Sequence, residues 1–386
     1  MKKICNSKIC TGCSLCSARC PVQCISMPLN EIGHRHPLID QDKCIDCGLC
    51  VKGCPAIHTI EAHRPLKAYA GWSRDTEDYQ SSSSGGAASV LSQYIIENGG
   101  IVYGCTIEPG IHVKHVRIDK KEDLWKLKGS KYVQSNIEDC ISSLKIDVRD
   151  KRPVLFIGTP CQVAAIKRIY KVQPTNLWLV DLICHGVPSE QVLVKFITEH
   201  WSIKRENVLS VKFRDEKGFH LIVTLKDGTK LSTTNIWTNR YFDDLYMNSF
   251  IDGFTYRESC YTCHYGKPER ISDITIGDFW GLGRKFPTDE IPEHKYGISC
   301  LLPNTEHGTQ LISNINGKMH LFERILEEAI DGNDQLRSPK SANWRINLFH
   351  IFNHYIGFSF RWYQLLTFDK RCLNILRRIK QRLKSK

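Results

Sequence analysis

The stretch from Val154 to Arg168, VLFIGTPCQVAAIKR, decides the fold class of this chain. Its apolar run ends at Gly158, a Thr-Pro corner follows, and a helical pattern opens at Cys161. The next segments repeat this order, because TNLWLVDLIC is strand-like and SEQVLVKFITEHW is helix-like. Strands that alternate with helices are typical of parallel strands joined by helical crossovers. We therefore expect an α/β core.

Further elements flank this core. IVYGC and HVKHVRI are strand-like, and GAASVLSQYIIENGG is helix-like. HLIVTLKDGTKLSTT carries Asp227-Gly228 between alternating segments, which predicts a β-hairpin. The polar stretch GWSRDTEDYQSSSSGG, residues 71–86, is expected to be a boundary loop.

The charge of the chain is unevenly spread. The protein has 386 residues and a formal charge of +12, and its length predicts two or three compact units. Residues 338–386 hold eleven Lys and Arg and one acidic residue, so this tail carries ten of the twelve net charges. The body is close to neutral, which argues against a nucleic-acid-binding surface, and we predict no nucleic-acid partner.

The sequence predicts neither export nor a membrane span. MKKICNSKIC has a basic start without an apolar h-region, and no run of about 18 apolar residues occurs. The eighteen cysteines are grouped in metal-ligand spacing inside a large chain. This usage favours a reducing compartment, so we expect a cytoplasmic protein.

Two cysteine runs dominate the first sixty residues. CTGCSLCSARCP begins at Cys10 and CIDCGLCVKGCP begins at Cys44, and both read C-x2-C-x2-C-x3-C-P. Bacterial ferredoxins with two 4Fe–4S clusters have this spacing, in which the fourth cysteine of each run reaches the other cluster. The spacing predicts cluster one on Cys10, Cys13, Cys16 and Cys54, and cluster two on Cys44, Cys47, Cys50 and Cys20.

Zinc knuckles are the alternative for these runs, because C-x2-C alone also suits zinc. Two repeats of four evenly spaced thiols, each followed by Pro, favour iron–sulfur clusters. Cys5 and Cys24 exceed the two ligand sets and are expected to pack near the clusters. His34 and His36 lie between the runs and are expected in an exposed turn.

Four later cysteines form a second candidate site. Cys161 follows one predicted strand and Cys184 ends the next, so parallel pairing would place both thiols at one edge of the sheet. SCYTCHYGK adds Cys260 and Cys263 as a C-x2-C pair in a polar loop. Together these thiols suit a third iron–sulfur cluster.

Two alternatives stay open for these thiols. Cys161 at a helix N-terminus could be an activated nucleophile with His185 as its base. The C-x2-C pair could instead hold zinc with His264. Among the other thiols, Cys140 falls in step with apolar residues on a helical face and is expected in the core, and Cys105, Cys300 and Cys372 are also expected to be packing residues.

Two polar segments are candidates for binding phosphate. The run Ser81 to Gly86 precedes a helix, and its hydroxyl and amide groups could hold a phosphate there, with a flexible linker as the alternative. KGSKYVQS, residues 128–135, combines cations, an aromatic ring and hydroxyls. Neither G-x-G-x-x-G nor the Walker A pattern occurs, so a Rossmann-type site or a P-loop has no support.

Several stretches together resemble the coenzyme F-420 hydrogenase/dehydrogenase beta-subunit family. They are SSSSGGAASVL, GSKYVQS, IGTPCQVAAIKR, VDLICHGVPS, FRDEKGFH, SCYTCHYGKPERISDITIGDFWGLG and GISCLLPNTEHG. They span the chain from about Arg64 to Gly332, and the family often carries a preceding ferredoxin module. No single stretch is specific for this family, but the stretches taken together are.

The resemblance implies an iron–sulfur flavoprotein. Its members bind FAD without a G-x-G-x-x-G loop and pass electrons between a deazaflavin, coenzyme F-420, and iron–sulfur clusters, and the resemblance supports the third cluster. It implies no nameable catalytic acid or base. By motif match it implies cofactor contacts at Ser84, Gly85, Gly86, Lys131, Tyr132, Gly158, Thr159 and Asp278, of which Asp278 is as well explained as a turn residue.

The expected architecture follows from these parts. We expect an α+β ferredoxin-like dicluster domain, then an α/β flavin-binding domain with a mixed sheet, then a helical basic tail. The ranges are 1–63 for the dicluster domain, 64–145 and 146–335 for the two parts of the beta-subunit-like domain, and 336–386 for the tail. The alternative function is an electron-transfer adaptor that holds clusters and turns over no organic substrate.

The partner of such a protein is expected to be a redox protein or a ferredoxin. The tail adds a second expectation, because Leu373, Leu376, Ile379 and Leu383 recur at helical spacing among basic residues. Such a helix suits an anionic membrane surface, which would be the inner membrane face, or an acidic partner. The alternative is a solvated helix that packs back on the body.

Overall fold

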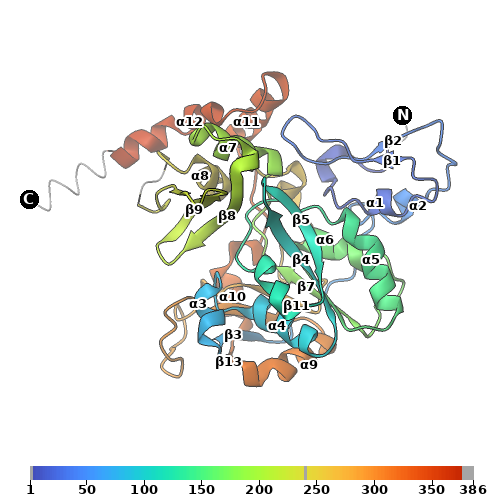
Figure 1. The fold of residues 1–386 in the computed structure, drawn as a ribbon, viewed down its shortest axis with the longest axis vertical. Coiled ribbons are helices and arrows are strands. Elements are labelled where there is room, and N and C mark those ends of the chain that lie inside the picture. Colours follow the sequence, from blue (N-terminus) through green and yellow to red (C-terminus); the bar gives the residue numbers. More distant parts are fainter. Residues whose placement is uncertain (1–2, 239–240, 376–386) are drawn as a thin grey trace, which may run out of the picture.

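The computed structural model describes residues 3–238 and 241–375. Figure 1 shows a small N-terminal module, in blue, beside a larger body whose last described helices lie across one end. The body is built on an eight-stranded sheet with helices on both faces and a second, three-stranded sheet. The expected mixture of α-helices and a large mixed sheet is therefore confirmed.

The N-terminal module consists of short elements around its cysteines. They are the 3-10 helix η1 (Ser7–Ile9), α1 (Leu15–Ala18), β1 (Ile25–Ser26), β2 (Leu38–Ile39) and α2 (Leu49–Lys52). Helices α1 and α2 each start after a residue with left-handed backbone, Ser14 at φ 58° and Gly48 at φ 70°. These residues hold the same place in the two cysteine runs. The two runs therefore turn in the same way, as their matched spacing predicts.

The large sheet runs in the order β13-β3-β12-β11-β7-β6-β4-β5. Its strands are β3 (Ala68–Ser73), β4 (Ile101–Glu108), β5 (His112–Ile118), β6 (Val154–Gly158), β7 (Leu177–Leu182), β11 (Ile274–Asp278), β12 (Ser299–Pro303) and β13 (Met319–Arg324). The pairs β4/β6, β6/β7 and β7/β11 are parallel, and the outer pairs are antiparallel. Gly158 pairs with Asp181, so β6 and β7 end at the same edge of the sheet.

Each face of this sheet is covered by helices. On one face, Phe156 of β6 and Tyr103 of β4 pack against α5 and α6. On the other face, the residues that precede these two, Leu155 and Val102, pack against α4 and α9. The alternation of side chains along a strand thus divides the core into two layers.

The helices of the body connect and flank these strands. They are α3 (Thr76–Ser81), α4 (Ala87–Glu97), η2 (Lys121–Leu127), α5 (Glu138–Arg149), α6 (Pro160–Lys167), α7 (Glu190–His200), η3 (Arg205–Asn207), α8 (Leu245–Asp252), η4 (Glu258–Thr262), α9 (Glu306–Ile315), η5 (Asn316–Lys318), α10 (Leu326–Gly332) and η6 (Asp334–Leu336). Cys140 and Cys300 are buried in this core, as predicted.

The second sheet is antiparallel and has the order β10-β9-β8. Its strands are β8 (Val208–Asp215), β9 (Gly218–Leu225) and β10 (Lys230–Ser232). The predicted hairpin is confirmed, since Asp227 and Gly228 lie in the turn between the paired strands β9 and β10 and Gly228 has φ 88°. Helices α7 and α8 pack on this sheet.

One expectation about the chain between the two modules is wrong. Residues 71–86 are not a boundary loop, because β3 continues to Ser73 and α3 follows. Trp72 is 6% exposed and packs against Phe322 of β13, with ring centroids 5.5 Å apart. The strand is buried between β12 and β13, and the polar residues that end and follow it, Ser73 and Arg74, hid this from a local reading of polarity.

The described part of the tail packs back on the body. It forms α11 (Trp344–Tyr355) and α12 (Phe360–Leu366), and Phe349 and Tyr363 pack against Phe254. Residues 368–375 are again helical. Most of the amphipathic helix predicted from Leu373 onward lies in residues 376–386, outside the described residues.

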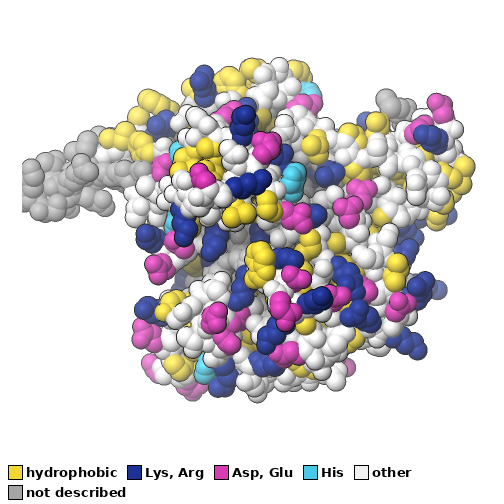
Figure 2. All heavy atoms as spheres, in the orientation of Figure 1, with side chains coloured by type: hydrophobic (Ala, Val, Ile, Leu, Met, Phe, Trp, Pro, Cys, Tyr) yellow, Lys and Arg dark blue, Asp and Glu magenta, His cyan; other side chains and the backbone are white. Residues whose placement is uncertain are grey.

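The surface charges of the molecule are mixed. Figure 2 shows Lys and Arg side chains interspersed with Asp and Glu over the visible face. Within the part of the chain that the structure describes, no helix is long and apolar enough to cross a bilayer.

A buried ion pair ties a late loop to the carboxyl end of β7. Arg270 donates from Nη2 to Asp181 Oδ2 at 2.8 Å, and the two side chains are 2% and 0% exposed. The same guanidinium donates from Nη1 to the Tyr265 carbonyl at 2.7 Å. The loop that carries Cys263 is therefore held against the end of β7.

Asp181→Ala is expected to lower the free energy of unfolding by about 3–5 kcal/mol, because Arg270 would stay buried without a counter-charge. Urea unfolding followed by tryptophan fluorescence measures this loss. The matched control is Glu327→Ala, which breaks the exposed pair with Arg64 and should cost less than about 1 kcal/mol. Equal losses in the two variants would contradict the prediction.

Candidate functional site

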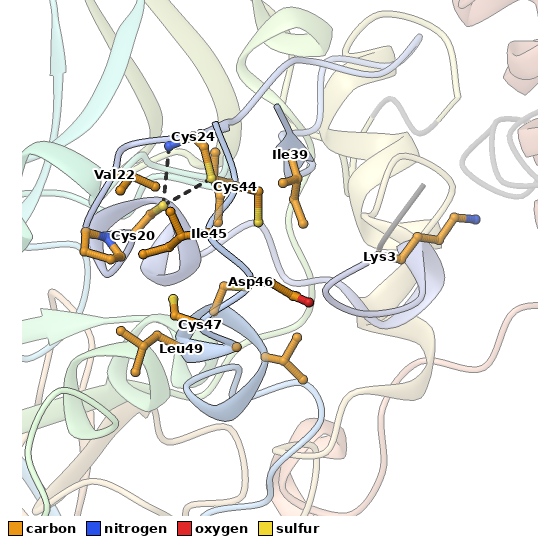
Figure 3. A pocket seen from close by; sticks show the side chains of 15 residues that line it. Lys3, Cys20, Val22, Cys24, Ile39, Cys44, Ile45, Asp46, Cys47 and Leu49 are labelled. Atoms are coloured by element: carbon orange, nitrogen blue, oxygen red, sulfur yellow. Dashed lines mark hydrogen bonds between the residues drawn. The ribbon is translucent and has the colours of Figure 1, made fainter. Parts of the chain in front are cut away.

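The cysteines of the N-terminal module line two cavities. One is lined by Cys10, Cys13, Cys16 and Cys54 with Cys5, and the other by Cys20, Cys44, Cys47 and Cys50 with Cys24. Each cavity takes three cysteines from one run and the last cysteine of the other, which is the crossed arrangement that the spacing predicts. Figure 3 shows the second cavity.

These cavities fit iron–sulfur clusters by their donor chemistry. Four thiols with an apolar surround, which includes Leu15 and Met27 in the first cavity, are what such clusters require. Among the described residues, no three His, Cys, Asp or Glu side chains converge on the position of a single ion. A cube binds its four thiolates at separate irons, so a cluster needs no such convergence.

The two surplus cysteines lie beside the ligand thiols. Cys24 is 4% exposed, and its Sγ is 3.4 Å from Cys20 Sγ. Its amide also donates to Cys20 Sγ at 3.4 Å. A hydrogen bond from Cys5 holds the pKa of Cys10 well below the usual range of a thiol. Both extra thiols therefore stand in the cavity walls and supply hydrogen bonds to the ligands.

The module is docked on the body through a buried arginine. Arg257 is 2% exposed and donates from Nε to the Cys10 carbonyl and from Nη2 to the Arg35 carbonyl, both at 2.6 Å. Gln134 reinforces the contact by donating from Nε2 to the Thr11 carbonyl at 2.8 Å. These hydrogen bonds are accepted by backbone carbonyls of the module, so they position its main chain and do not depend on its side chains.

The expectation of exposed histidines between the cysteine runs is wrong. His34 is 1% exposed, and its Nδ1 lies 3.3 Å from Gln134 Oε1. His36 Nε2 lies 3.3 Å from Arg257 Nη2. The turn that carries them inserts into the body, where Ser189 donates to the Ile32 carbonyl. The docking of the module, which the local sequence does not reveal, buries this turn.

The four later cysteines meet at the carboxyl edge of the large sheet. Cys161 lies in the first turn of α6, Cys184 follows β7, and Cys260 and Cys263 lie in and after η4. Burial raises the pKa of Cys161 to about 12, and the charges of Cys184 and Cys263 add to the shift. Burial raises the pKa of Cys260 to about 12, and the charges of Cys263 and Cys161 add to the shift. The structure therefore brings all four thiols within electrostatic reach of one another.

The two alternatives for these thiols find little support in the geometry. A nucleophilic Cys161 needs a lowered pKa, whereas burial raises it. His185, its candidate base, packs near Phe250 with ring centroids 6.4 Å apart, and burial lowers its pKa. His264 is exposed, and among the described residues no three His, Cys, Asp or Glu side chains converge on a position for a zinc ion.

The third thiol set lies close to the first cavity of the module. Tyr265, 9% exposed, belongs to the same apolar cluster as Leu15 of the module. Cys13 of the module and Cys161 and Cys263 of the body all pack on this cluster. The thiol sets of the two parts are thus separated by a layer of packed side chains around Tyr265.

Two segments with candidate cofactor contacts lie against each other. Ser83 Oγ accepts a hydrogen bond from the Ser130 amide at 2.7 Å, and Lys128 Nζ donates to Ser81 Oγ at 2.5 Å. The two segments carry five of the eight candidate contacts, namely Ser84, Gly85, Gly86, Lys131 and Tyr132. Gly158 and Thr159 lie at the end of β6 and the start of α6.

The Ser-Gly run is a packed helix start, so the flexible-linker alternative is wrong. Ser84 Oγ donates to the Ile298 carbonyl at 2.8 Å. A Cβ on Gly85 would lie 2.0 Å from the Gly71 carbonyl oxygen, so a larger residue does not fit there. Gly86 has φ 84° and caps α4, whose Ala87 amide donates to Ser299 Oγ at 3.5 Å. Because the Ser84 hydroxyl is already hydrogen-bonded, the run would bind a ligand through its backbone amides more than through its hydroxyls.

Lys131 and Tyr132 sit in contrasting surroundings. Lys131 donates from Nζ to the Leu127 and Lys128 carbonyls at 2.7 and 2.8 Å, and desolvation lowers its pKa to about 8. Tyr132 packs among aromatic rings, with its centroid 5.0 Å from that of Phe250. The pair offers one titratable cation beside an apolar surface.

Asp278 forms an ion pair that the sequence did not suggest. Arg214 donates to both of its carboxylate oxygens, at 2.9 and 3.1 Å, and stands over the Phe219 ring at 5.2 Å. Trp280 lies 6.2 Å from Phe219 between ring centroids. Arg214 and Phe219 both lie in FRDEKGFH, so the motif was visible but the partner of Asp278 was not. The pair links β8 of the small sheet to β11 of the large one.

Two family models match the body of the chain. One is described as coenzyme F420 hydrogenase/dehydrogenase, beta subunit N-term, and matches residues 68–142. The other is the C terminus of the same subunit and matches residues 151–326. The chain belongs to this family. A 4Fe-4S dicluster domain matches residues 9–57, so the docked module is a 4Fe–4S module and the protein is an iron–sulfur oxidoreductase that transfers electrons.

Among solved structures, the chain is similar to one chain of the F420-reducing NiFe hydrogenase complex from Methanosarcina barkeri, a structure described as a xenon derivatization. The match has 19% identity and a TM-score of 0.43, and it covers 71% of this chain and 91% of that chain. No curated protein matches this chain.

Arg257→Met is expected to loosen the docked module, because two buried carbonyl acceptors lose their donors at about 1–3 kcal/mol each. Amide exchange in residues 28–37 should speed up by about tenfold or more, as measured by hydrogen–deuterium exchange with mass spectrometry. Arg19→Met is the control, since it removes one half-buried contact to the Arg168 carbonyl. Unchanged exchange in Arg257→Met would show that other contacts hold the module.

Proposed function

We propose that this protein relays electrons among FAD, three 4Fe–4S clusters and a two-electron organic partner of the coenzyme F420 type. The observation that carries the proposal is the meeting of Cys161, Cys184, Cys260 and Cys263 beside the docked dicluster module. Two thiols on adjacent strand ends and two in a loop would form a complete set of cluster ligands, at the sheet edge where α/β proteins place their sites.

The position of the module supports a fixed order of electron transfer. Cluster one would be held by Cys10, Cys13, Cys16 and Cys54, and it would lie next to the third set across Tyr265. Cluster two would be held by Cys20, Cys44, Cys47 and Cys50. Cys47 is exposed, so cluster two would lie nearest to solvent and exchange electrons with a partner redox protein. Electrons could pass along this order in either direction.

Flavin chemistry suits the point where this relay meets an organic molecule, because a flavin exchanges electrons in pairs or singly. The residues that would hold it are Gly85 and Gly86 through their amides, Lys131 at the phosphates, and Tyr132 and Gly158 beside the ring system. Their donor types fit a phosphate-bearing, partly apolar cofactor.

A planar, anionic partner such as a deazaflavin would fit the junction of the two sheets. Trp280 is 46% exposed and its ring lies 6.2 Å from that of Phe219, between centroids. The guanidinium of Arg214, which pairs with Asp278, lies over the same Phe219 ring. An aromatic surface next to a fixed guanidinium suits a flat ring with a negative charge. Asp278 would therefore act by orienting Arg214.

The cellular setting of this relay is also part of the proposal. The cysteine usage favours the cytoplasm, and the partner would be a ferredoxin or another redox protein. Contact of the basic tail with the inner membrane face or an acidic partner would involve residues beyond 375. The alternative, an adaptor that holds clusters without flavin, is distinguished by the experiment that follows.

Protein purified and reconstituted without oxygen is expected to hold about twelve irons per chain and a releasable flavin, since each cluster contains four irons. Cys263→Ala should lower the count to about eight, whereas Cys300→Ala, whose thiol is buried away from the set, should keep about twelve. Iron analysis and visible spectra measure both. About eight irons in the parent protein would refute the third cluster, and clusters without flavin would favour the adaptor.

Flavin affinity is expected to fall as the pH rises through about 8, the pKa to which desolvation lowers Lys131. The ammonium is protonated below that pH and attracts phosphate, and it is neutral above it. The loss should be about tenfold between about pH 7 and about pH 9.5, since a charge-assisted hydrogen bond contributes about 1.5–3 kcal/mol. Quenching of flavin fluorescence by the apoprotein measures the affinity.

The arginine variant supplies the control, because its guanidinium stays charged throughout this range. Lys131→Arg should flatten the pH profile, and Lys131→Met should bind weakly at both pH values. A parent profile that stays level from about pH 7 to about pH 9.5 would refute a phosphate contact at Lys131.

A further inference from the structure

A chain of buried polar side chains runs from β5 to the first turn of α6. It begins at His115, 3% exposed, whose Nδ1 lies 2.9 Å from Ser135 Oγ. Gln162 donates from Nε2 to Ser135 Oγ at 2.9 Å. Thr159 Oγ1 lies 3.1 Å from Gln162 Oε1 and 3.2 Å from Cys161 Sγ. A candidate cluster ligand is thus the last member of a hydrogen-bonded chain.

Backbone groups fix the direction of the hydrogen bonds along this chain. The Ile157 carbonyl faces His115 Nε2 at 2.9 Å and can only accept, so Nε2 carries the proton. Burial lowers the pKa of His115 to about 4, so the ring is neutral and Nδ1 is an acceptor. Ser135 must therefore donate its hydroxyl hydrogen to His115, and its oxygen is left to accept from Gln162.

The orientation of the Gln162 amide follows from two further backbone groups. Its Nε2 donates to the Ser135 carbonyl at 3.0 Å, and its Oε1 accepts from the Thr159 amide at 3.0 Å. Since Oε1 already has a donor, the hydroxyl hydrogen of Thr159 has two possible acceptors. These are Gln162 Oε1 and Cys161 Sγ.

Metal binding by Cys161 would determine which of these two atoms accepts the hydroxyl hydrogen of Thr159. A cysteine that ligates iron is a thiolate, and a charged acceptor forms a stronger hydrogen bond than a neutral amide oxygen. Hydrogen bonds to the cysteine sulfurs are among the factors that set the reduction potential of an iron–sulfur cluster. A donor stabilises the reduced cluster more than the oxidised one, because reduction adds one negative charge.

We propose that the Thr159 hydroxyl donates to the Cys161 thiolate and raises the reduction potential of the third cluster, with Gln162, Ser135 and His115 as positioning residues. This inference rests on the proposed function, since it requires the third cluster. The step that it tunes is the gain of one electron by the cluster, with no proton transferred. Thr159 then serves the cluster ligand rather than the flavin.

The test is a comparison of Thr159→Val and Thr159→Ser, because valine keeps the shape of threonine without the hydroxyl and serine keeps the hydroxyl. Redox titrations followed by electron paramagnetic resonance give the midpoint potential of each cluster. In Thr159→Val, the third cluster should shift to a more negative potential while the other two stay unchanged. Thr159→Ser should return it to near the parent value.

A second variant tests the competition for the hydroxyl hydrogen. Gln162→Met removes the competing acceptor, so the potential of the third cluster should move in the positive direction or stay at the parent value. Pulsed electron paramagnetic resonance after exchange into heavy water reads out the hydrogen bond directly. An exchangeable deuteron coupled to the third cluster should be present in the parent protein and lost in Thr159→Val.

The outcomes separate this inference from the proposed function. About twelve irons with an unshifted third cluster in Thr159→Val would overturn the inference and leave the relay intact. A shift of the flavin potential in place of the cluster potential would also overturn it, because it would assign Thr159 to the flavin. About eight irons in the parent protein would overturn the relay itself, and the inference with it.

Discussion

The contact on which the candidate site depends is the buried ion pair between Arg270 and Asp181. Asp181 is the last residue of β7 that pairs with β6, opposite Gly158, so it lies where the parallel strands lead to Cys161 and Cys184. Arg270 binds this carboxylate and also the backbone of the loop that follows Cys263. Separating these two buried charges would cost free energy, because each would stay buried without a partner. The ion pair therefore holds the loop against the end of β7.

The docked module extends the same principle to a second interface. Arg257 precedes Cys260 by three residues and donates to the carbonyl of Cys10, a candidate ligand of cluster one. One short segment of chain therefore carries both a cysteine of the third thiol set and the contact that positions the first set. Because the Arg257 guanidinium donates to backbone carbonyls, it holds the main chain of the module in a set position relative to Cys260. A rigid spacing of this kind suits electron transfer over a set distance.

Several features were predictable because they depend on local spacing. The crossed cysteine sets follow from C-x2-C-x2-C-x3-C-P, and the parallel pairing of β6 and β7 follows from the strand–helix alternation. The hairpin at Asp227 and Gly228 follows from turn chemistry. The errors arose where burial comes from distant segments. The segment of β3 looked polar but is buried between β12 and β13, and His34 looked exposed because the body that buries it is far along the chain. The partner of Asp278 was hidden for the same reason, since Arg214 lies in another sheet.

The sequence by itself determined the family, the dicluster module and the identity of the twelve candidate ligand cysteines, because ligand spacing and motif order are properties of the linear chain. Only the tertiary structure decided how these thiols meet. It placed Cys161 beside Cys184, Cys260 and Cys263, docked the module through Arg257, and linked Thr159 to His115 through a buried chain of hydrogen bonds. Those contacts depend on the packing of segments up to about 250 residues apart, such as Arg257 and Cys10. Local spacing holds no information about such contacts, because burial and hydrogen-bond partners arise only when the sheets and the module have come together.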